Sequence, residues 1–302
     1  MRAALRLFRV ANTPSAVADV LSGIVVAGGS IASVDAWLSA SASLFLYGAG
    51  VARNDIEDCV KDASLHPDRP LPSGALSERR ARLLVLAAEL VGVVLAAVSV
   101  RSSAVYGAPW IAAAAAVLVV LLAVSYNAVH DRRPLLGAAL MAATRMANFL
   151  RGVVFAFLWT AGKGMNLAPI AVALSAHGVL IFAVTRISQL EGVPSPATLP
   201  KRRLLFVLTA PVAILVLAVT VKDPVTAMGL AATASAWSAW AMRPATFTPP
   251  VAGACVGRAI GTWTLWNALS VAAAGTFLQA VAVAVLFPVA KILRLVTAQR
   301  GA

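Results

Sequence analysis

The amino-acid sequence predicts an all-α, polytopic membrane protein with about nine to ten transmembrane helices. First, 60% of its 302 residues are hydrophobic and only 12% are charged, whereas roughly a quarter of the residues of a soluble domain are charged. Second, apolar runs of about 20 residues, long enough to cross a bilayer as a helix, recur from one end of the chain to the other. Third, basic residues gather in short clusters between these runs, as they do in the loops of membrane proteins.

We expect ten apolar segments in chain order. They are residues 14–33, 37–54, 81–100, 109–127, 135–160, 168–188, 204–221, 224–241, 253–272 and 276–295. Each is interpreted as a helix, because a backbone in lipid must satisfy its hydrogen bonds within the segment. No polar linker or globular insert separates the segments, so we expect a single domain over residues 1–302.

The charges of the loops orient these segments. The connections after the second, fourth and sixth segments are rich in Arg and Lys, whereas the first connection has no basic residue and the other alternate connections carry at most one. Basic loops stay in the cytoplasm, so we expect the N-terminus and these connections there. Lys291, Arg294 and Arg300 near the end of the chain favour ten segments over nine. This clustering also argues against nucleic acid as a partner, despite the net charge of +13.

A dense group of ionisable residues, NDIEDCVKD, follows the second segment. On a helix Asp55, Asp58 and Asp62 share one face, and Asn54 lies close to the face of Asp58. Carboxylates this close repel one another unless a cation lies among them, and oxygen ligands favour Mg²⁺, which often binds a substrate's phosphates as well. The stretch predicts a site for a phosphorylated lipid at the membrane surface. Solvated carboxylates at a helix end, balancing nearby arginines, are the alternative.

Other polar residues are expected on the same side of the bundle. Tyr126 and His130 are four residues apart at the end of the fourth segment, and Arg145 and Asn148 are three apart within the fifth. A charge as deep as Arg145 needs an anionic partner. The remaining members are Asn12 before the first segment, and Gln189 and Glu191 at the end of the sixth. We expect these side chains to converge on one cytoplasmic-side cavity, although Tyr126 and His130 alone also suit an interfacial belt.

These motifs resemble those of the UbiA superfamily of intramembrane prenyltransferases. The residues Asn54–Asp62 match the family pattern NDxxDxxxD, and RPLPSG at Arg69–Gly74 matches the loop that follows it. RVANTP resembles the family's RPxN start, and TRMANFLRG resembles its RxxN element. Tyr126 fits the YxxxK element, with His130 in place of the lysine. The resemblance implies that Mg²⁺ helps to hold an isoprenyl diphosphate, which ionises to an allylic cation that an acceptor attacks.

The resemblance also implies roles for individual residues. Catalytic roles are implied for Asp58, Asp62, Arg145 and Glu191. Metal binding is implied for Asp55, Asp58 and Asp62. Substrate binding is implied for Asn12, Asn54, Arg69, Tyr126, His130, Asn148 and Gln189.

The second aspartate motif of the family is degenerate here. Gln189 and Val193 stand at its two aspartate positions, and Glu191 is the acidic residue that remains. In this departure the chain resembles a divergent branch of the family, the EboC-like proteins. That branch accompanies a gene cluster implicated in moving precursors across the bacterial inner membrane. The chain is therefore expected in that membrane, with its motifs at the cytoplasmic side.

Three functions from different classes are compatible with these observations. The first is an Mg²⁺-dependent prenyltransferase that binds an isoprenyl diphosphate and an unknown acceptor. The second is a non-catalytic lipid-binding or export component that retains only the first aspartate motif. The third is a transporter, which the lack of a recognisable inverted repeat or of paired broken helices disfavours.

Overall fold

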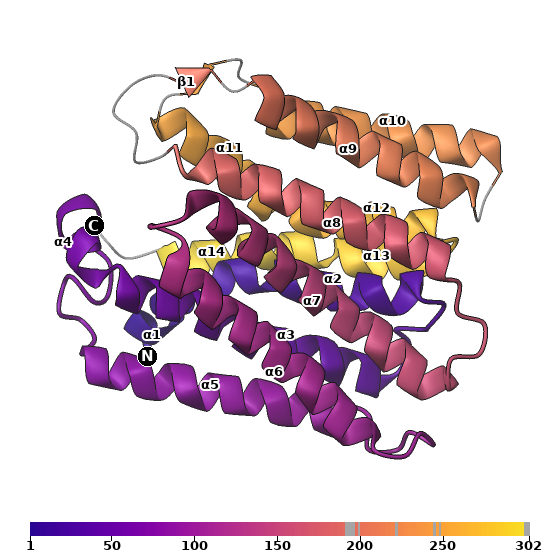
Figure 1. Cartoon of the computed structure of the whole chain (residues 1–302), viewed down its shortest axis with the longest axis horizontal. Coiled ribbons are helices and arrows are strands. Elements are labelled where there is room, and N and C mark those ends of the chain that lie inside the picture. Colours follow the sequence, from indigo (N-terminus) through magenta and orange to yellow (C-terminus); the bar gives the residue numbers. More distant parts are fainter. Residues whose placement is uncertain (191–196, 199, 221–222, 244–245, 248, 299–302) are drawn as a thin grey trace.

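The computed structural model describes residues 1–190, 197–198, 200–220, 223–243, 246–247 and 249–298. Its longer helices run side by side along the long axis of the molecule (Figure 1). The first half of the chain forms α1 (Arg2–Leu7), the 3₁₀ turn η1 (Val10–Asn12), α2 (Thr13–Val26), α3 (Val34–Glu57), α4 (Cys59–Leu65), α5 (Glu78–Val98), α6 (Ala108–Val129) and α7 (Pro134–Thr160). The second half forms α8 (Leu167–Ser188), β1 (Ala197–Thr198), α9 (Pro200–Val219), α10 (Pro224–Ala241), β2 (Thr246–Phe247), α11 (Pro249–Gly261), α12 (Trp263–Ala273), α13 (Phe277–Ala284) and α14 (Leu286–Ala298).

The predicted all-α membrane fold is confirmed, and each predicted apolar segment coincides with a helix or a pair of helices. Within the described ranges, five helical runs are long and apolar enough to cross a membrane: α5, α6, α7, α8 and the run Phe277–Thr297. Three segments differ clearly from expectation, and one of them is the tenth, which is interrupted at Val285 between α13 and α14. The first helix ends at Val26, because Gly28 adopts the left-handed region with φ of 85°. The ninth segment is interrupted at Thr262, between α11 and α12.

Successive long helices alternate in direction, so their loops fall at two ends of the bundle. The short helix α4, the strand β1, the N-terminus and the end of α14 lie toward the same end (Figure 1). We call this the α4 end. There β1 pairs antiparallel with β2, which links the loops that follow α8 and α10.

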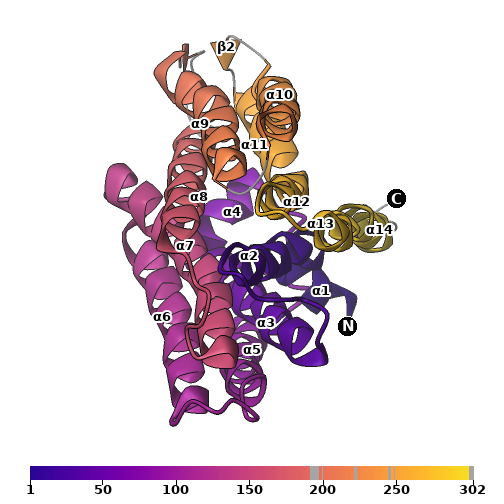
Figure 2. The same cartoon turned by 90° about the vertical axis from the view of Figure 1, so that its right-hand side faces the viewer.

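Helix α2 lies in the middle of the bundle (Figure 2), where it contacts α3, α7 and α12. All of its residues from Thr13 to Val26 are buried. Its crossing with α7 is unusually close: a Cβ on Gly152 would lie 2.0 Å from the Val20 carbonyl oxygen, and one on Gly23 would lie 2.1 Å from the Phe149 carbonyl oxygen. Glycines allow membrane helices to pack backbone against backbone, and this contact sets polar residues of α7 directly against α2.

Candidate functional site

The acidic motif lies at the α4 end, where α3 passes almost without a break into α4. Asp55 is in the last turn of α3, Asp58 joins the two helices and Asp62 is in α4. The backbone hydrogen bonds continue through the junction, from Asp58 N to Asn54 O at 2.9 Å and from Asp62 N to Asp58 O at 2.8 Å. The side chains of Asp55 and Asp62 are buried, and that of Asp58 is half-buried.

Two arginines neutralise the buried carboxylates. Arg9 Nη2 lies 2.6 Å from Asp55 Oδ1. Arg69 Nη1 lies 3.6 Å from the same oxygen and also donates a short hydrogen bond to Asp62. Arg9 adopts a left-handed backbone conformation, with φ of 41°, a region that non-glycine residues occupy uncommonly. This sharp bend lets the N-terminal segment bring a cation to the motif.

Asp58 has a different partner, His130 at the end of α6. His130 Nε2 lies 3.7 Å from Asp58 Oδ2 and 3.7 Å from Asp131 Oδ1. The imidazole stacks on Tyr126, with ring centroids 4.9 Å apart. Asn54 Nδ2 donates to Asp58 Oδ2 at 3.1 Å. The contact with His130 lowers the pKa of Asp58, and the same contact raises the pKa of His130.

The motif therefore divides into two parts. The sequence placed Asp55, Asp58 and Asp62 around one metal ion. In the structure Asp55 and Asp62 share Arg69, whereas the oxygens of Asp58 and Asp131 and a ring nitrogen of His130 all lie within 4.8 Å of one another. Carboxylate and imidazole groups are metal ligands, so the residues at this position are chemically suited to a divalent ion, with a donor set that includes nitrogen.

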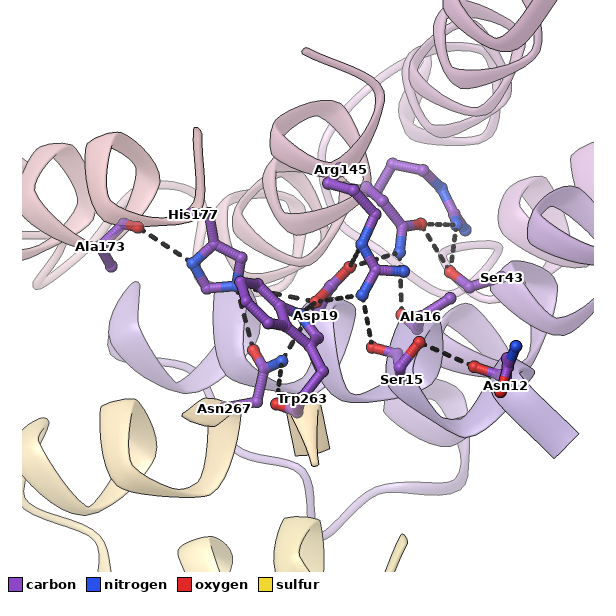
Figure 3. Close-up of polar contacts among 12 residues, drawn as sticks. Asn12, Ser15, Ala16, Asp19, Ser43, Arg145, Ala173, His177, Trp263 and Asn267 are labelled. Carbon is purple, nitrogen blue, oxygen red and sulfur yellow. Dashed lines mark hydrogen bonds and ion pairs between the residues drawn. The ribbon is translucent and has the colours of Figure 1, made fainter. Parts of the chain in front are cut away.

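A second polar cluster lies deeper in the bundle, around Asp19 of α2 (Figure 3). Arg145 Nε lies 3.0 Å from Asp19 Oδ2, and Arg145 Nη2 donates to Asp19 Oδ1 and to the Ser15 carbonyl oxygen, both at 3.3 Å. Asn148 Nδ2 donates to the Ala16 carbonyl oxygen at 2.8 Å. Asp19 is thus the anionic partner that the position of Arg145 requires.

Residues of α8 and α12 complete the surroundings of Asp19. Trp263 Nε1 donates to Asp19 Oδ1 at 2.7 Å, and Asn267 Nδ2 donates to the same oxygen at 3.1 Å. His177 Nε2 lies 3.1 Å from Asn267 Oδ1. Buried charges persist where they are paired and hydrogen-bonded, and here one carboxylate links α2, α7, α8 and α12.

The cluster continues toward α3 through Arg151. Its Nη1 donates to Ser43 Oγ at 2.8 Å, and its Nη2 donates to the Ser39 carbonyl oxygen at 3.0 Å. Ser43 in turn donates to Asn148 Oδ1 at 2.7 Å. The pair Arg145 and Asn148 therefore belongs to an interhelical network and does not join the acidic motif: Arg145 lies 11 residues into α7, about 16 Å along that helix.

The remaining predicted site residues have other neighbours. Asn12 Oδ1 accepts a hydrogen bond from Arg294 Nη2 of α14 at 3.4 Å. Gln189 accepts a hydrogen bond from Arg186 and donates to the Pro134 carbonyl oxygen at 2.8 Å. Glu191 and Val193 lie outside the described residues. The expected single cavity is thus replaced by two clusters, one at the α4 end and one around Asp19.

Sequence reasoning missed Arg9, Asp131 and Asp19 as members of these clusters. A signal for Asp19 was present, because it is the only ionisable residue in the apolar segment 14–33, and an ionisable residue within a membrane span is a functional-site hypothesis by default. Arg9 was marked only as the first residue of RVANTP and was given no role, and Asp131 carried no signal in the sequence. Their roles depend on which loops meet at the α4 end.

A separate groove of about 540 Å³ runs between α8 and α9. Its lining is mainly aliphatic, as at Val172, Leu208 and Val212, and includes no residue of either cluster. The groove therefore does not identify the polar site.

Comparisons with known proteins agree on the family to which the chain is similar. The UbiA prenyltransferase family matches residues 16–252. Digeranylgeranylglyceryl phosphate synthase of Natronomonas pharaonis is 29% identical over 226 residues, 72% of this chain and 76% of that protein. The protein of the same name from Methanopyrus kandleri is 35% identical over 200 residues, 66% of this chain and 67% of its own.

A solved structure agrees in fold. It is described as "Structural and mechanistic insights into the biosynthesis of Digeranylgeranylglyceryl phosphate synthase in membranes". It superposes with a TM-score of 0.59 at 16% identity, covering 93% of this chain and 98% of the other. The likeness extends over almost the whole bundle.

Proposed function

The chain belongs to the UbiA prenyltransferase family, and from this premise we propose that it binds an isoprenyl diphosphate with Mg²⁺ at the α4 end, on the cytoplasmic side of the membrane. The observation that carries the proposal is the contact of Asp55 and Asp62 with Arg9 and Arg69, beside Asp58 of the same motif. Carboxylates and arginines in contact at the end of a membrane bundle can receive both a metal ion and the phosphates that the ion bridges.

The arginines are suited to the substrate's charge. An arginine can bind a phosphate through two parallel N–H donors. Arg69, in the loop after α4, already contacts the carboxylates of Asp55 and Asp62. When a diphosphate binds, Arg9 and Arg69 contact it while Asp55, which contacts both, holds their guanidinium groups in place. Mg²⁺, when bound, supplies the positive charge that stabilises the leaving diphosphate, and Asp58 and Asp62 are the carboxylates that would hold it.

The orientation follows from the loop charges. The α4 end carries the basic loops around Arg79, Arg132 and Arg203, whereas the loops of the other end carry isolated bases such as Arg101 and Lys163. The positive-inside rule assigns the richer set to the cytoplasm. In a bacterial cell the acidic motif would face the cytoplasm from the inner membrane.

The proposed reaction is prenyl transfer. The bond between the allylic carbon and the diphosphate oxygen breaks, the diphosphate leaves, and an acceptor oxygen attacks the allylic carbon and loses its proton. The relatives carry the name digeranylgeranylglyceryl phosphate synthase. We therefore take geranylgeranyl diphosphate as the donor, and a prenylated glyceryl phosphate as the acceptor, for the first assays.

One observation favours a second candidate function. Gln189, at the first aspartate position of the degenerate motif, already bonds Arg186 and the Pro134 carbonyl oxygen, and an amide is a weaker metal ligand than a carboxylate. A chain with only the first motif supports lipid-diphosphate binding without transfer, as an EboC-like export or lipid-binding component requires. Binding with little or no turnover is the result that would favour this candidate.

The test uses purified full-length protein in nanodiscs with labelled geranylgeranyl diphosphate and Mg²⁺. Binding, diphosphate release and formation of a doubly prenylated glyceryl phosphate are measured separately. We expect saturable, Mg²⁺-dependent binding with slow release. A matched control is Asp68→Asn, because Asp68 is an exposed neighbour that pairs with Arg6 outside the motif, and it should bind like the native protein. Absence of saturable binding by the native protein would refute the proposal.

A further inference from the structure

The ring of His130 is held in an orientation typical of a metal ligand. Its Nδ1 lies 3.2 Å from the Asn127 carbonyl oxygen, to which it can only donate. Its Nε2 is 3.5 Å from Asn54 Nδ2 and faces the carboxylates of Asp58 and Asp131, so Nε2 is the ring nitrogen that can exchange its proton for a metal ion. Metal-ligating histidines usually donate their other ring N–H to a carbonyl or carboxylate, which fixes the tautomer. Tyr126 packs on the ring and holds it in this position.

The Nε2 nitrogen faces two carboxylates. Oxygens of Asp58 and Asp131 each lie 3.7 Å from this nitrogen. Ligands placed about 2.1 Å from one ion are roughly 3.4 Å apart in a tetrahedral site and about 4.2 Å apart when opposite in an octahedral one. The two separations from Nε2 lie between these values, and the oxygens of Asp58 and Asp131 lie within 4.8 Å of each other, so the three groups can reach one ion after side-chain movements.

We infer that Asp58, His130 and Asp131 bind a divalent transition-metal ion, such as Mn²⁺, Co²⁺ or Zn²⁺, when no diphosphate is present. Imidazole suits these ions, whereas Mg²⁺ prefers oxygen ligands alone. Three protein ligands leave positions open on the ion, and a phosphate oxygen can occupy one of them. The inference rests on the proposed function for the role of Asp58 in diphosphate binding, but the metal binding itself needs no substrate.

Lys61 is the group that the ion replaces. Its Nζ lies 3.1 Å from Asp131 Oδ1. Both side chains are more than half exposed, and exposed ion pairs of this kind contribute little stability. A divalent ion between Asp58 and Asp131 can therefore displace the ammonium group into solvent.

The test is a titration of chelator-treated, full-length protein with Co²⁺ and no isoprenyl diphosphate. Calorimetry gives the stoichiometry and affinity, and the visible spectrum of Co²⁺ reports nitrogen and oxygen ligation. We expect one ion per chain, not displaced by an equal concentration of Mg²⁺. His130→Lys and Asp131→Asn should each weaken Co²⁺ binding about tenfold or more, since each removes a ligand. His66→Lys is the matched control, because His66 is exposed beyond α4, and it should leave the affinity unchanged.

Three outcomes overturn the inference: no stoichiometric Co²⁺ binding, equal affinity for Mg²⁺, or native affinity in both ligand variants. Asp131 is exposed, so its variant stays informative even where His130→Lys folds poorly. The proposed function is assessed independently by geranylgeranyl diphosphate binding in Mg²⁺. Diphosphate binding without Co²⁺ binding would refute the inference alone, and Co²⁺ binding without diphosphate binding would refute the proposed function alone.

Discussion

The guanidinium group of Arg145 lies 3.0 Å from the carboxylate of Asp19, and both side chains are buried between helices of a membrane bundle. The pair joins α2 to α7, and Trp263 and Asn267 extend it to α12. Removing one partner of a buried pair leaves the other charge uncompensated, which costs much more than the pair itself contributes. The pair is therefore expected to determine whether these helices stay together.

Asp19→Asn should lower the free energy of unfolding by about 3 kcal/mol, because Arg145 remains buried without an anion. Thermal unfolding of the protein in a fixed detergent measures the effect. Asp223→Asn is the matched control, since Asp223 caps α10 by accepting from the Thr226 backbone N–H at 2.9 Å and Asn caps a helix equally well.

The double variant Asp19→Asn with Arg145→Gln separates the charge effect from a loss of packing. Both charges are removed, so the double variant should lose less stability than the sum of the two single changes. The prediction would be contradicted if the stability losses of the two single variants added up in the double variant, or if Asp19→Asn were as stable as the native protein. Either result would show that the ion pair does not stabilise the packing of these helices.

Gly152→Ala should destabilise the protein by about 1–3 kcal/mol or more, because the added methyl group overpacks a tight contact. The new Cβ would lie 2.0 Å from the Val20 carbonyl oxygen and 2.8 Å from the Ile24 amide nitrogen, and backbone atoms cannot rotate away. Thermal unfolding and the monodispersity of the purified protein report the change.

Gly229→Ala supplies the comparison for that experiment. Gly229 lies within α10, and a Cβ there would have no heavy atom within 4 Å. Alanine in an open helix position is favoured over glycine, so this variant should be as stable as the native protein or more so. Equal behaviour of the two alanine variants would contradict the close crossing of α2 and α7.

Hydropathy predicted the helices well, because the length of an apolar run is a local property of the sequence. The interruption at Thr262 was not visible in the sequence, since no proline or glycine pair marks it. The partners of the acidic motif were also hidden: Arg9 precedes Asp55 by 46 residues, and the packing of α1 against α3 and of η1 against α2 and α14 is not visible in the sequence. The pattern that predicts Asp55 and Asp62 on one helix face cannot reveal which cation that face will meet.

The ten-segment interpretation predicts that both ends of the chain lie in the cytoplasm. A reporter fused after Ala302 should give a cytoplasmic signal, and one inserted beside Lys163, in the loop between α7 and α8, should give the opposite signal. The physical basis is the excess of basic residues at the α4 end. If the C-terminal reporter lay on the same side of the membrane as the Lys163 insertion, the result would favour nine membrane segments over ten.

The degenerate motif predicts slow turnover. Gln189→Asp combined with Val193→Asp restores two carboxylates at the family's aspartate positions, so release of diphosphate from labelled geranylgeranyl diphosphate should rise. The matched amide variant, Val193→Asn with native Gln189, adds no charge and should not raise the rate. Brisk release by the native protein would show that these two carboxylates are dispensable here.

The central claim is that the acidic motif holds an isoprenyl diphosphate through a metal ion, and equilibrium binding of labelled geranylgeranyl diphosphate tests it most directly. The native protein in nanodiscs should bind in Mg²⁺ and lose binding when the metal is chelated. The double variant Asp58→Asn with Asp62→Asn should bind about tenfold or more weakly, because two anionic oxygen ligands are removed; it should stay folded, because Arg69 keeps its contact with Asp55. Unchanged, metal-independent binding by a folded double variant would contradict the claim.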